Sequence, residues 1–339
     1  MKRTLKAMLA AAIAAQFGTG AASAQEITLR VADHYPANSP SAAMTARYFM
    51  DEVTRRTNGR VKFEYFPAQQ LGKAKDMLKL TLSGVTDIGF AAPAYVSDAL
   101  PLGAVAELPG TFSHPCEGTR AFLKLARDGI LREKEYAPNK VRLLIAMMLP
   151  PYQILLRTPI TGLESFKGQK LRTGGGLQVI SIESLGAVPV RIAGPEIYES
   201  MARGTLDGLV FPLPSLEQYK LQEHVKYSTI GMNFGSFASS YVISERKWNS
   251  LPADIRGIMD RVAVETSLHA CNKMGDDMKP AIERLKAAGI QFVDLPAGDK
   301  ARIKDLLSPV GTRWAKQLDD RGQPGTQVLD AFLQALKEN

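Results

Sequence analysis

Two kinds of hydrophobic pattern follow one another along the first ninety residues of the chain. Short segments that alternate apolar and polar side chains are typical of half-buried strands, and longer segments with apolar side chains at i, i+3 and i+4 are typical of helices. Their order, strand–helix–strand–helix–strand, predicts a parallel sheet with helical crossovers. The strands are predicted at 27–35, 61–66 and 87–92, and the helices at 39–57 and 73–83.

A similar series of short strands and helices begins after residue 140. One helical pattern, from Pro252 to about Ala288, is much longer than the mean helix of about 11–12 residues and is long enough to run across two lobes. The strands are predicted at 141–148, 152–157, 170–173, 189–192, 208–212 and 291–296, and the helices at 177–185, 195–203, 298–320 and 324–337.

These two series predict an α/β fold with two lobes. A chain of 339 residues is expected to form about two domains, because single hydrophobic cores stop growing near roughly 250–300 residues. No long flexible linker separates the two series. We therefore expect a cleft between closely joined lobes, and such clefts are preferred sites for small molecules.

The amino terminus predicts export. Residues 1–24 contain a basic start, an Ala-rich apolar stretch and a terminal Ala22-Ser23-Ala24, the three parts of a cleaved secretory signal. The apolar stretch is too short for a comfortable membrane span, which needs about 20 apolar residues. Cleavage would remove three basic residues and lower the net charge from +8 to +5. A periplasmic protein without stable membrane insertion is expected.

The remaining charges and the rare residue types exclude several classes of function. Basic residues are interspersed with acidic ones and form no run with aromatic side chains, so no nucleic-acid partner is expected. The four histidines do not have zinc-binding spacing, and no G-x-S-x-G nucleophile motif occurs. Gly174-Gly175-Gly176 lacks the spacing of nucleotide-binding motifs. We expect no catalytic residue, metal or cofactor.

The two cysteines, Cys116 and Cys271, leave two alternatives open. In an oxidising compartment they can form a disulfide, provided that their Cα atoms lie within about 7 Å. Otherwise they remain two inert thiols.

One charged residue stands out by its position. Arg172 lies at the end of the predicted strand KLRT, directly before the glycine turn. Ligands of open α/β sheets bind at the carboxyl ends of strands, and a guanidinium there matches a carboxylate with two directed hydrogen bonds. The alternative is an arginine that is solvated or paired with a neighbouring acid.

Several segments together resemble the DctP-like solute-binding proteins of tripartite ATP-independent periplasmic (TRAP) transporters. The resemblance extends over essentially the whole mature chain, and its most specific elements are Q-L-G, F-K-G-x-K-L-R and G-T-L-D-G. The segments are 66–95, 163–173, 187–212 and 241–256, together with the first strand and helix.

This resemblance implies a hinged, two-lobed binding protein, not an enzyme, that closes on a carboxylate and delivers it to a membrane permease. Each lobe would be a mixed sheet flanked by helices, with the long helix after Pro252 spanning both, and a monomer is expected. The implied lobes are 26–149 plus 238–277 and 150–237 plus 278–339.

The family's anchoring arginine falls on Arg172, whereas other pocket positions depart from the family pattern. A second arginine of sialic-acid-type members is replaced by Tyr152, and a frequent asparagine is replaced by Phe211. The expected ligand-binding set is Arg172, Tyr152, Phe211, His34, Tyr95, Ala92 and Asn233. Aromatic and small apolar residues thus replace charged and amide groups.

The departures favour a ligand with one carboxylate and a flat, less polar body, such as an aromatic or a keto or hydroxy monocarboxylate. Alternatively, the aromatic residues only fill space around a small organic acid. A C4-dicarboxylate or sugar-acid binder of the same family, a ligand-sensing subunit of a signalling receptor and a periplasmic enzyme acting on a carboxylate remain as alternatives.

Overall fold

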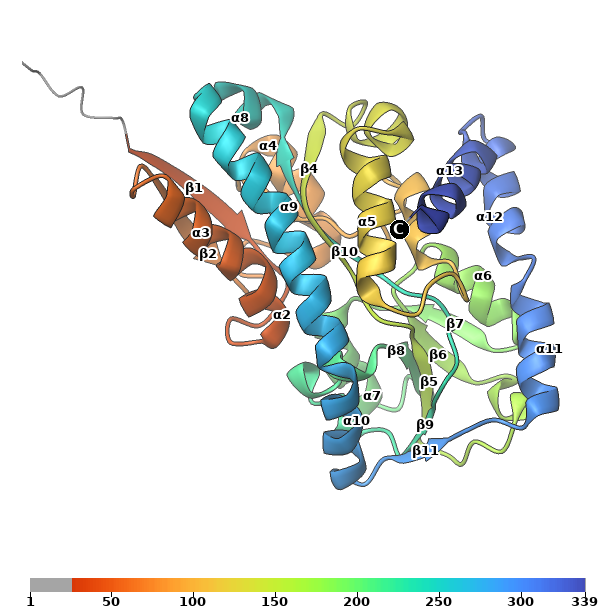
Figure 1. The fold of residues 1–339 in the computed structure, drawn as a ribbon. Helices are drawn as coiled ribbons and strands as arrows, with labels where there is room; N and C mark the ends of the chain where they lie inside the picture. The colour runs from red at the N-terminus through yellow and green to blue at the C-terminus, as the bar shows by residue number, and fades with distance from the viewer. Residues whose placement is uncertain (1–25, 339) are drawn as a thin grey trace, which may run out of the picture.

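The computed structural model describes residues 26–338, and the predicted signal segment 1–24 lies outside them. The described chain forms two sheets with helices on their faces (Figure 1). This is the α/β, two-lobed architecture expected from the two series of strands.

The first sheet has five strands in the order β2-β1-β3-β10-β4. Strands β1, β2 and β3 are parallel, as predicted, whereas β10 is antiparallel to both of its neighbours. The sheet is therefore mixed. Its strands are β1 Ile27–Ala32, β2 Val61–Phe66, β3 Ile88–Phe90, β4 Val141–Met148 and β10 Ala238–Ser244.

The second sheet has six strands in the order β11-β9-β5-β8-β6-β7. Here β6 is parallel to β7 and β8, and β5 is antiparallel to β8 and β9. The strands are β5 Gln153–Leu156, β6 Lys170–Thr173, β7 Val188–Arg191, β8 Gly208–Phe211, β9 Tyr227–Thr229 and β11 Gln291–Val293.

Helices cover both sheets, and shorter 3₁₀ and π segments connect them. The π segments are η2 Ala43–Arg47 and η5 Arg132–Tyr136; the 3₁₀ segments used below are η4 Leu102–Glu107, η8 Leu213–Ser215 and η9 Glu217–Tyr219. The α-helices are α2 Pro40–Ala42, α3 Tyr48–Arg56, α4 Met77–Ser83, α5 Pro115–Arg127, α6 Leu177–Ser184, α7 Ile197–Ala202, α8 Glu245–Ser250, α9 Ala253–Asp276, α10 Met278–Ala287, α11 Ala297–Leu307, α12 Val310–Asp319 and α13 Gly325–Lys337.

The long helical pattern after Pro252 forms two consecutive helices, α9 and α10, that run from the first lobe to the second (Figure 1). They are separated at Asp277, where a single continuous helix was predicted. Pro280 explains the break, because its ring nitrogen has no hydrogen to donate to the carbonyl of Asp276 and its ring crowds that carbonyl. Pro309 likewise divides the predicted helix 298–320 into α11 and α12.

The hydrophobic core extends from one lobe into the other. Every residue of β10, β5 and β8 is buried, and one cluster of buried side chains includes residues of both sheets. A second cluster lies beneath α7 and α10. The carboxyl ends of β1 and β3 in the first sheet, and of β6 and β8 in the second, supply the side chains of the site described below.

Cys116 and Cys271 form a disulfide between α5 and α9, with 5.0 Å between their Cα atoms. The alternative of two free thiols is therefore excluded. The disulfide joins two helices that pack on β4 of the first sheet, and the loop that it closes, with a sequence separation of 155 residues, contains strands β5 to β9 of the second sheet.

Candidate functional site

Arg172 lies near the carboxyl end of β6, between β7 and β8, and its side chain has no exposed surface. Its Nε donates a hydrogen bond to the carbonyl of Ile192 at 2.8 Å. Its Nη2 donates to the hydroxyl of Tyr95 at 3.3 Å. These two bonds hold the guanidinium in one orientation at the boundary between the sheets.

The third nitrogen of this guanidinium is not satisfied by the protein. Arg172 Nη1 is buried and has no hydrogen-bond partner among residues 26–338. No carboxylate of these residues forms an ion pair with Arg172, whereas many other arginines of the chain are paired. Because a buried charge without a counter-charge is costly, an anion would complete this arrangement, and a carboxylate matches its geometry.

Tyr95 adds a second donor beside Arg172. Its hydroxyl oxygen accepts hydrogen bonds from Arg172 Nη2 and from the backbone N–H of Gly194, the latter at 2.9 Å. A hydroxyl has two lone pairs and one hydrogen. With both lone pairs engaged, the hydrogen of Tyr95 is left to donate to an anion that lies against Nη1.

Aromatic rings surround the guanidinium. Arg172 Cζ lies 5.2 Å from the centre of the Phe211 ring, within the range of a cation–π contact. The Phe211 ring is in turn 6.1 Å from both the Tyr152 ring and the Tyr219 ring. On the other side, the rings of Tyr95 and Phe237 are 5.0 Å apart. The surroundings of the charge are thus flat and apolar.

These residues enclose a cavity of about 20 Å³, which has room for little more than one water molecule. Its lining comes from β6 and β8 of the second sheet, from the loops after β1 and β3 of the first sheet, and from the segments that cross between the sheets. The lining residues are His34, Tyr35, Tyr95, Leu149, Tyr152, Arg172, Gly194, Phe211, Ser215, Gln218, Tyr219 and Phe237.

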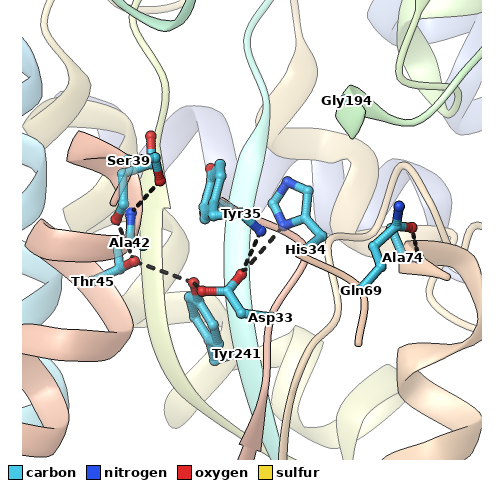
Figure 2. Close-up of polar contacts among 12 residues, drawn as sticks. Asp33, His34, Tyr35, Ser39, Ala42, Thr45, Gln69, Ala74, Gly194 and Tyr241 are labelled. Atoms are coloured by element: carbon cyan, nitrogen blue, oxygen red, sulfur yellow. Dashed lines mark hydrogen bonds and ion pairs between the residues drawn. The ribbon is translucent and has the colours of Figure 1, made fainter. Parts of the chain in front are cut away.

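His34 follows the end of β1, lines the cavity and lies beside the buried carboxyl group of Asp33. Figure 2 shows His34, Tyr35 and Tyr241 grouped around Asp33. Asp33 accepts hydrogen bonds from the hydroxyls of Tyr65 and Tyr241, both at 2.8 Å, and from the backbone of Tyr35. His34 Nδ1 is 3.5 Å from Asp33 Oδ1, which is too long for a close hydrogen bond, and it has no hydrogen-bond partner within the described chain.

Burial determines the charge of the titratable groups around Arg172. It lowers the pKa of His34, although the neighbouring Asp33 opposes this shift, so the imidazole is neutral. It raises the pKa values of Tyr152 and Tyr219 well above the usual range. The side chains that share the cavity with Arg172 therefore supply hydrogen bonds and ring surfaces, but no negative charge.

A buried acid, Glu107, lies where η4 meets the start of α6. Glu107 Oε2 accepts a hydrogen bond from the backbone N–H of Leu177 at 3.1 Å, and Oε1 has no partner within the described chain. Burial raises the pKa of Glu107 to about 8, and this rise is opposed by backbone hydrogen bonds and by the charges of Arg172 and Arg191. Glu107 is therefore largely protonated at neutral pH.

The structure brings five of the seven expected site residues together around the cavity: Arg172, Tyr152, Phe211, His34 and Tyr95. The other two do not line it. Ala92 is buried in the turn after β3, where its carbonyl accepts the N–H of Tyr95. Asn233 bonds to the carbonyl of Phe112 and lines two other hollows, of about 570 and 580 Å³.

Several lining residues were not identified from the sequence. Tyr35 directly follows His34 after the end of β1, so the choice of His34 as a site residue could also have led to Tyr35. Ser215, Gln218 and Tyr219 lie in or beside the short 3₁₀ segments after β8, and Phe237 lies just before β10. These segments have no periodicity, and their position depends on how the two lobes meet.

Across residues 26–338, no three His, Cys, Asp or Glu side chains lie close enough to hold a metal ion. Over the same range, no helix is both long and apolar enough to cross a bilayer.

Known proteins resemble this chain in sequence and in fold. A relative from Rhodobacter capsulatus, the C4-dicarboxylate-binding periplasmic protein DctP, is 26% identical over 323 residues, which cover 93% of this chain and 92% of the relative. A TRAP solute-binding protein from Rhodoferax ferrireducens, solved with copurified benzoate, superposes with a TM-score of 0.85 at 22% identity and covers 92% of this chain and 98% of its own. A marine-metagenome TRAP protein specific for aromatic acid ligands, solved with 3-hydroxybenzoate, also gives a TM-score of 0.85 at 22% identity, covering 93% of this chain and 99% of its own.

The family comparison covers most of the chain. The sequence profile of bacterial extracellular solute-binding protein, family 7 (DctP), matches residues 31–317. Family members and structural relatives are substrate-binding proteins of transport systems rather than enzymes. The chain belongs to this DctP family of TRAP-transporter solute-binding proteins.

Proposed function

We propose that this protein captures a flat, aromatic monocarboxylate between its two lobes and delivers it to the membrane permease of a TRAP transporter. The observation that carries the proposal is the buried Arg172, whose Nη1 has no partner among the described residues. A ligand carboxylate would accept hydrogen bonds from Nη1 and from the hydroxyl of Tyr95. Each charge-assisted bond contributes about 1.5–3 kcal/mol.

The lining supports one carboxylate rather than two. Arg172 is the one Lys or Arg side chain among the residues that line the cavity, so a second carboxylate would have no cation to meet. Phe211, Tyr152 and Tyr219 instead offer ring faces and edges, against which an aromatic ring packs favourably. Similar proteins that were solved with benzoate and with 3-hydroxybenzoate are consistent with this ligand class.

Binding is coupled to closure in this proposal. We assign residues 26–149 plus 238–277 to one lobe and 150–237 plus 278–339 to the other, a division that the strand membership of the two sheets supports. Contacts between the lobes include Ser41 Oγ with Gln218 Oε1 at 2.8 Å. A cavity of about 20 Å³ has no room for a benzoate, so the lobes or the lining rings move to admit it. A ligand that touches both lobes then favours the closed state.

The same proposal places the protein in the periplasm as a monomer, after removal of the signal segment 1–24. The disulfide between Cys116 and Cys271 supports an oxidising compartment, where such bonds persist. The periplasmic relatives agree with this location.

Arg172→Met tests the anchor directly. We expect benzoate affinity, measured by isothermal titration calorimetry on the mature protein, to fall at least about tenfold, because the charge-assisted hydrogen bond from Nη1 is lost while that from Tyr95 is retained. The thermal stability of the ligand-free variant should not fall, because the substitution removes a buried charge without a counter-charge.

Arg142→Met is the matched control, because the Arg142 guanidinium also lies over an aromatic ring, 5.0 Å from the centre of Trp248. This variant should bind benzoate like the wild type. Normal binding by Arg172→Met would contradict the anchor. A wild-type protein that binds succinate or galacturonate but no aromatic acid would contradict the proposed ligand class.

A further inference from the structure

Ser215 is a buried hydroxyl that the protein itself leaves unused. It ends the 3₁₀ segment η8 and is 2% exposed. Its Oγ has no hydrogen-bond partner among residues 26–338, although most buried polar atoms in folded proteins have one. Ser215 also lines the cavity that contains Arg172. Three residues of the lining thus have a buried polar atom without a hydrogen-bond partner within the described chain: Arg172 Nη1, Ser215 Oγ, and His34 Nδ1, which lies 3.5 Å from Asp33 Oδ1.

A second hydroxyl, that of Tyr219, lines the same cavity and contacts His34 across the lobes. Tyr219 Oη is 3.4 Å from His34 Nε2. The opposite ring nitrogen of the neutral His34 faces Asp33 Oδ1, an acceptor that favours the hydrogen on Nδ1. His34 Nε2 is then the acceptor, so Tyr219 donates to it and keeps its own oxygen lone pairs. Tyr219 is therefore oriented to accept a hydrogen bond within the cavity.

The hydroxyl of Tyr219 lies close to the anchor but is not bonded to it. A Cβ atom at Gly194 would be 3.0 Å from Tyr219 Oη and 3.4 Å from Tyr95 Oη, so both hydroxyls lie around one backbone position. Tyr95 is bonded to Arg172, whereas Tyr219 is bonded to His34. The ring of Phe211 lies near both the guanidinium of Arg172 and the ring of Tyr219.

We propose that Ser215 and Tyr219 bind a hydroxyl group of the ligand while Arg172 binds its carboxylate. Ser215 can donate to this hydroxyl, and Tyr219 can accept its hydrogen, so one ligand O–H satisfies both. The preferred ligands are then hydroxy-substituted aromatic monocarboxylates rather than unsubstituted ones. The inference rests on the proposed function and narrows its ligand class.

The test compares benzoate with 3-hydroxybenzoate and 4-hydroxybenzoate by isothermal titration calorimetry on the mature protein. We expect wild type to bind one of the hydroxylated acids at least about tenfold more tightly than benzoate. Ser215→Ala and Tyr219→Phe should each reduce this preference about five- to tenfold, because each removes one neutral hydrogen bond. The measured quantity is the ratio of the two dissociation constants, which a general loss of stability does not change.

Ser181→Ala is the matched control. Ser181 is fully buried in α6, which belongs to the same lobe as Ser215, but it does not line the cavity. Its variant should retain the wild-type preference. Equal affinity of wild type for benzoate and both hydroxybenzoates, or a preference that survives both variants, overturns this inference while the proposed function stands. If none of the three acids binds, the proposed function fails with it.

Discussion

Two buried charged residues, Asp33 and Arg172, occupy corresponding places in the two lobes. Each lies at the carboxyl end of a parallel strand, β1 or β6, and neither has any exposed surface. They differ in their partners. Asp33 receives hydrogen bonds from Tyr65, Tyr241 and the backbone of Tyr35.

Arg172 has partners for Nε and Nη2 but none for Nη1 within the described chain. Burial alone therefore does not separate a structural charge from a binding charge. The informative quantity is how many hydrogen-bonding positions the protein leaves open. A charge whose partners are all internal stabilises the fold, whereas a charge with an open position is suited to a ligand.

The largest expected effect is on stability and comes from Asp33→Ala. This substitution leaves two tyrosine hydroxyls and a backbone N–H without their acceptor in a buried site, and we expect a loss of about 3–5 kcal/mol. Urea denaturation of the ligand-free protein measures it. Asp320→Ala, which removes an exposed partner of Lys316, is the control and should lower the free energy of unfolding far less than Asp33→Ala does, because exposed ion pairs contribute little. A loss below about 1 kcal/mol for Asp33→Ala would remove the distinction from Arg172.

Glu107 is a third buried charged-type residue, intermediate between Asp33 and Arg172, and the pH dependence of stability tests how its open position acts. One of its oxygens has a backbone donor, the other has no partner among the described residues, and its pKa is raised from 4.5 to about 8. Between these values the folded protein retains a proton that the unfolded chain has released, so this group lowers stability as pH rises from about 4.5 to 8.

Glu107→Gln should remove this dependence, which amounts to about 5 kcal/mol over that window. Glu135, another buried acid with a pKa raised to about 8, keeps its own contribution in the variant and provides the internal reference. Denaturation midpoints at several pH values measure the slope. An unchanged slope in the variant would show that Glu107 is ionised in the folded protein.

The sequence predicted most of the strands and helices because their periodicity is a local property. It did not predict β9 and β10, whose short or fully buried segments carry no alternation, or the helix break before Pro280. Arg172 could be selected because a strand end followed by glycines is visible in one segment. Ser215 and Tyr219 could not, since they lie in irregular segments that reach the cavity only when the two lobes meet.

The smallest expected effect comes from the removal of one hydroxyl group beside Asp33, and it tests whether the surroundings of Asp33 are separate from those of Arg172. Tyr65→Phe removes one of the hydrogen bonds to Asp33 and should cost about 1–2 kcal/mol of stability, because hydrogen bonds to charged groups are the stronger ones. Tyr198→Phe is the matched control, since Tyr198 donates to Glu223 at 3.0 Å on the surface, where water replaces the lost bond. The loss of stability in Tyr198→Phe should therefore be clearly smaller than that in Tyr65→Phe. Because Tyr65 does not line the cavity, Tyr65→Phe should leave the affinity for the best carboxylate within about twofold of wild type. A larger loss of affinity than of stability would mean that the Asp33 cluster acts on the ligand as well as on the fold, and the two buried charges would then belong to one site.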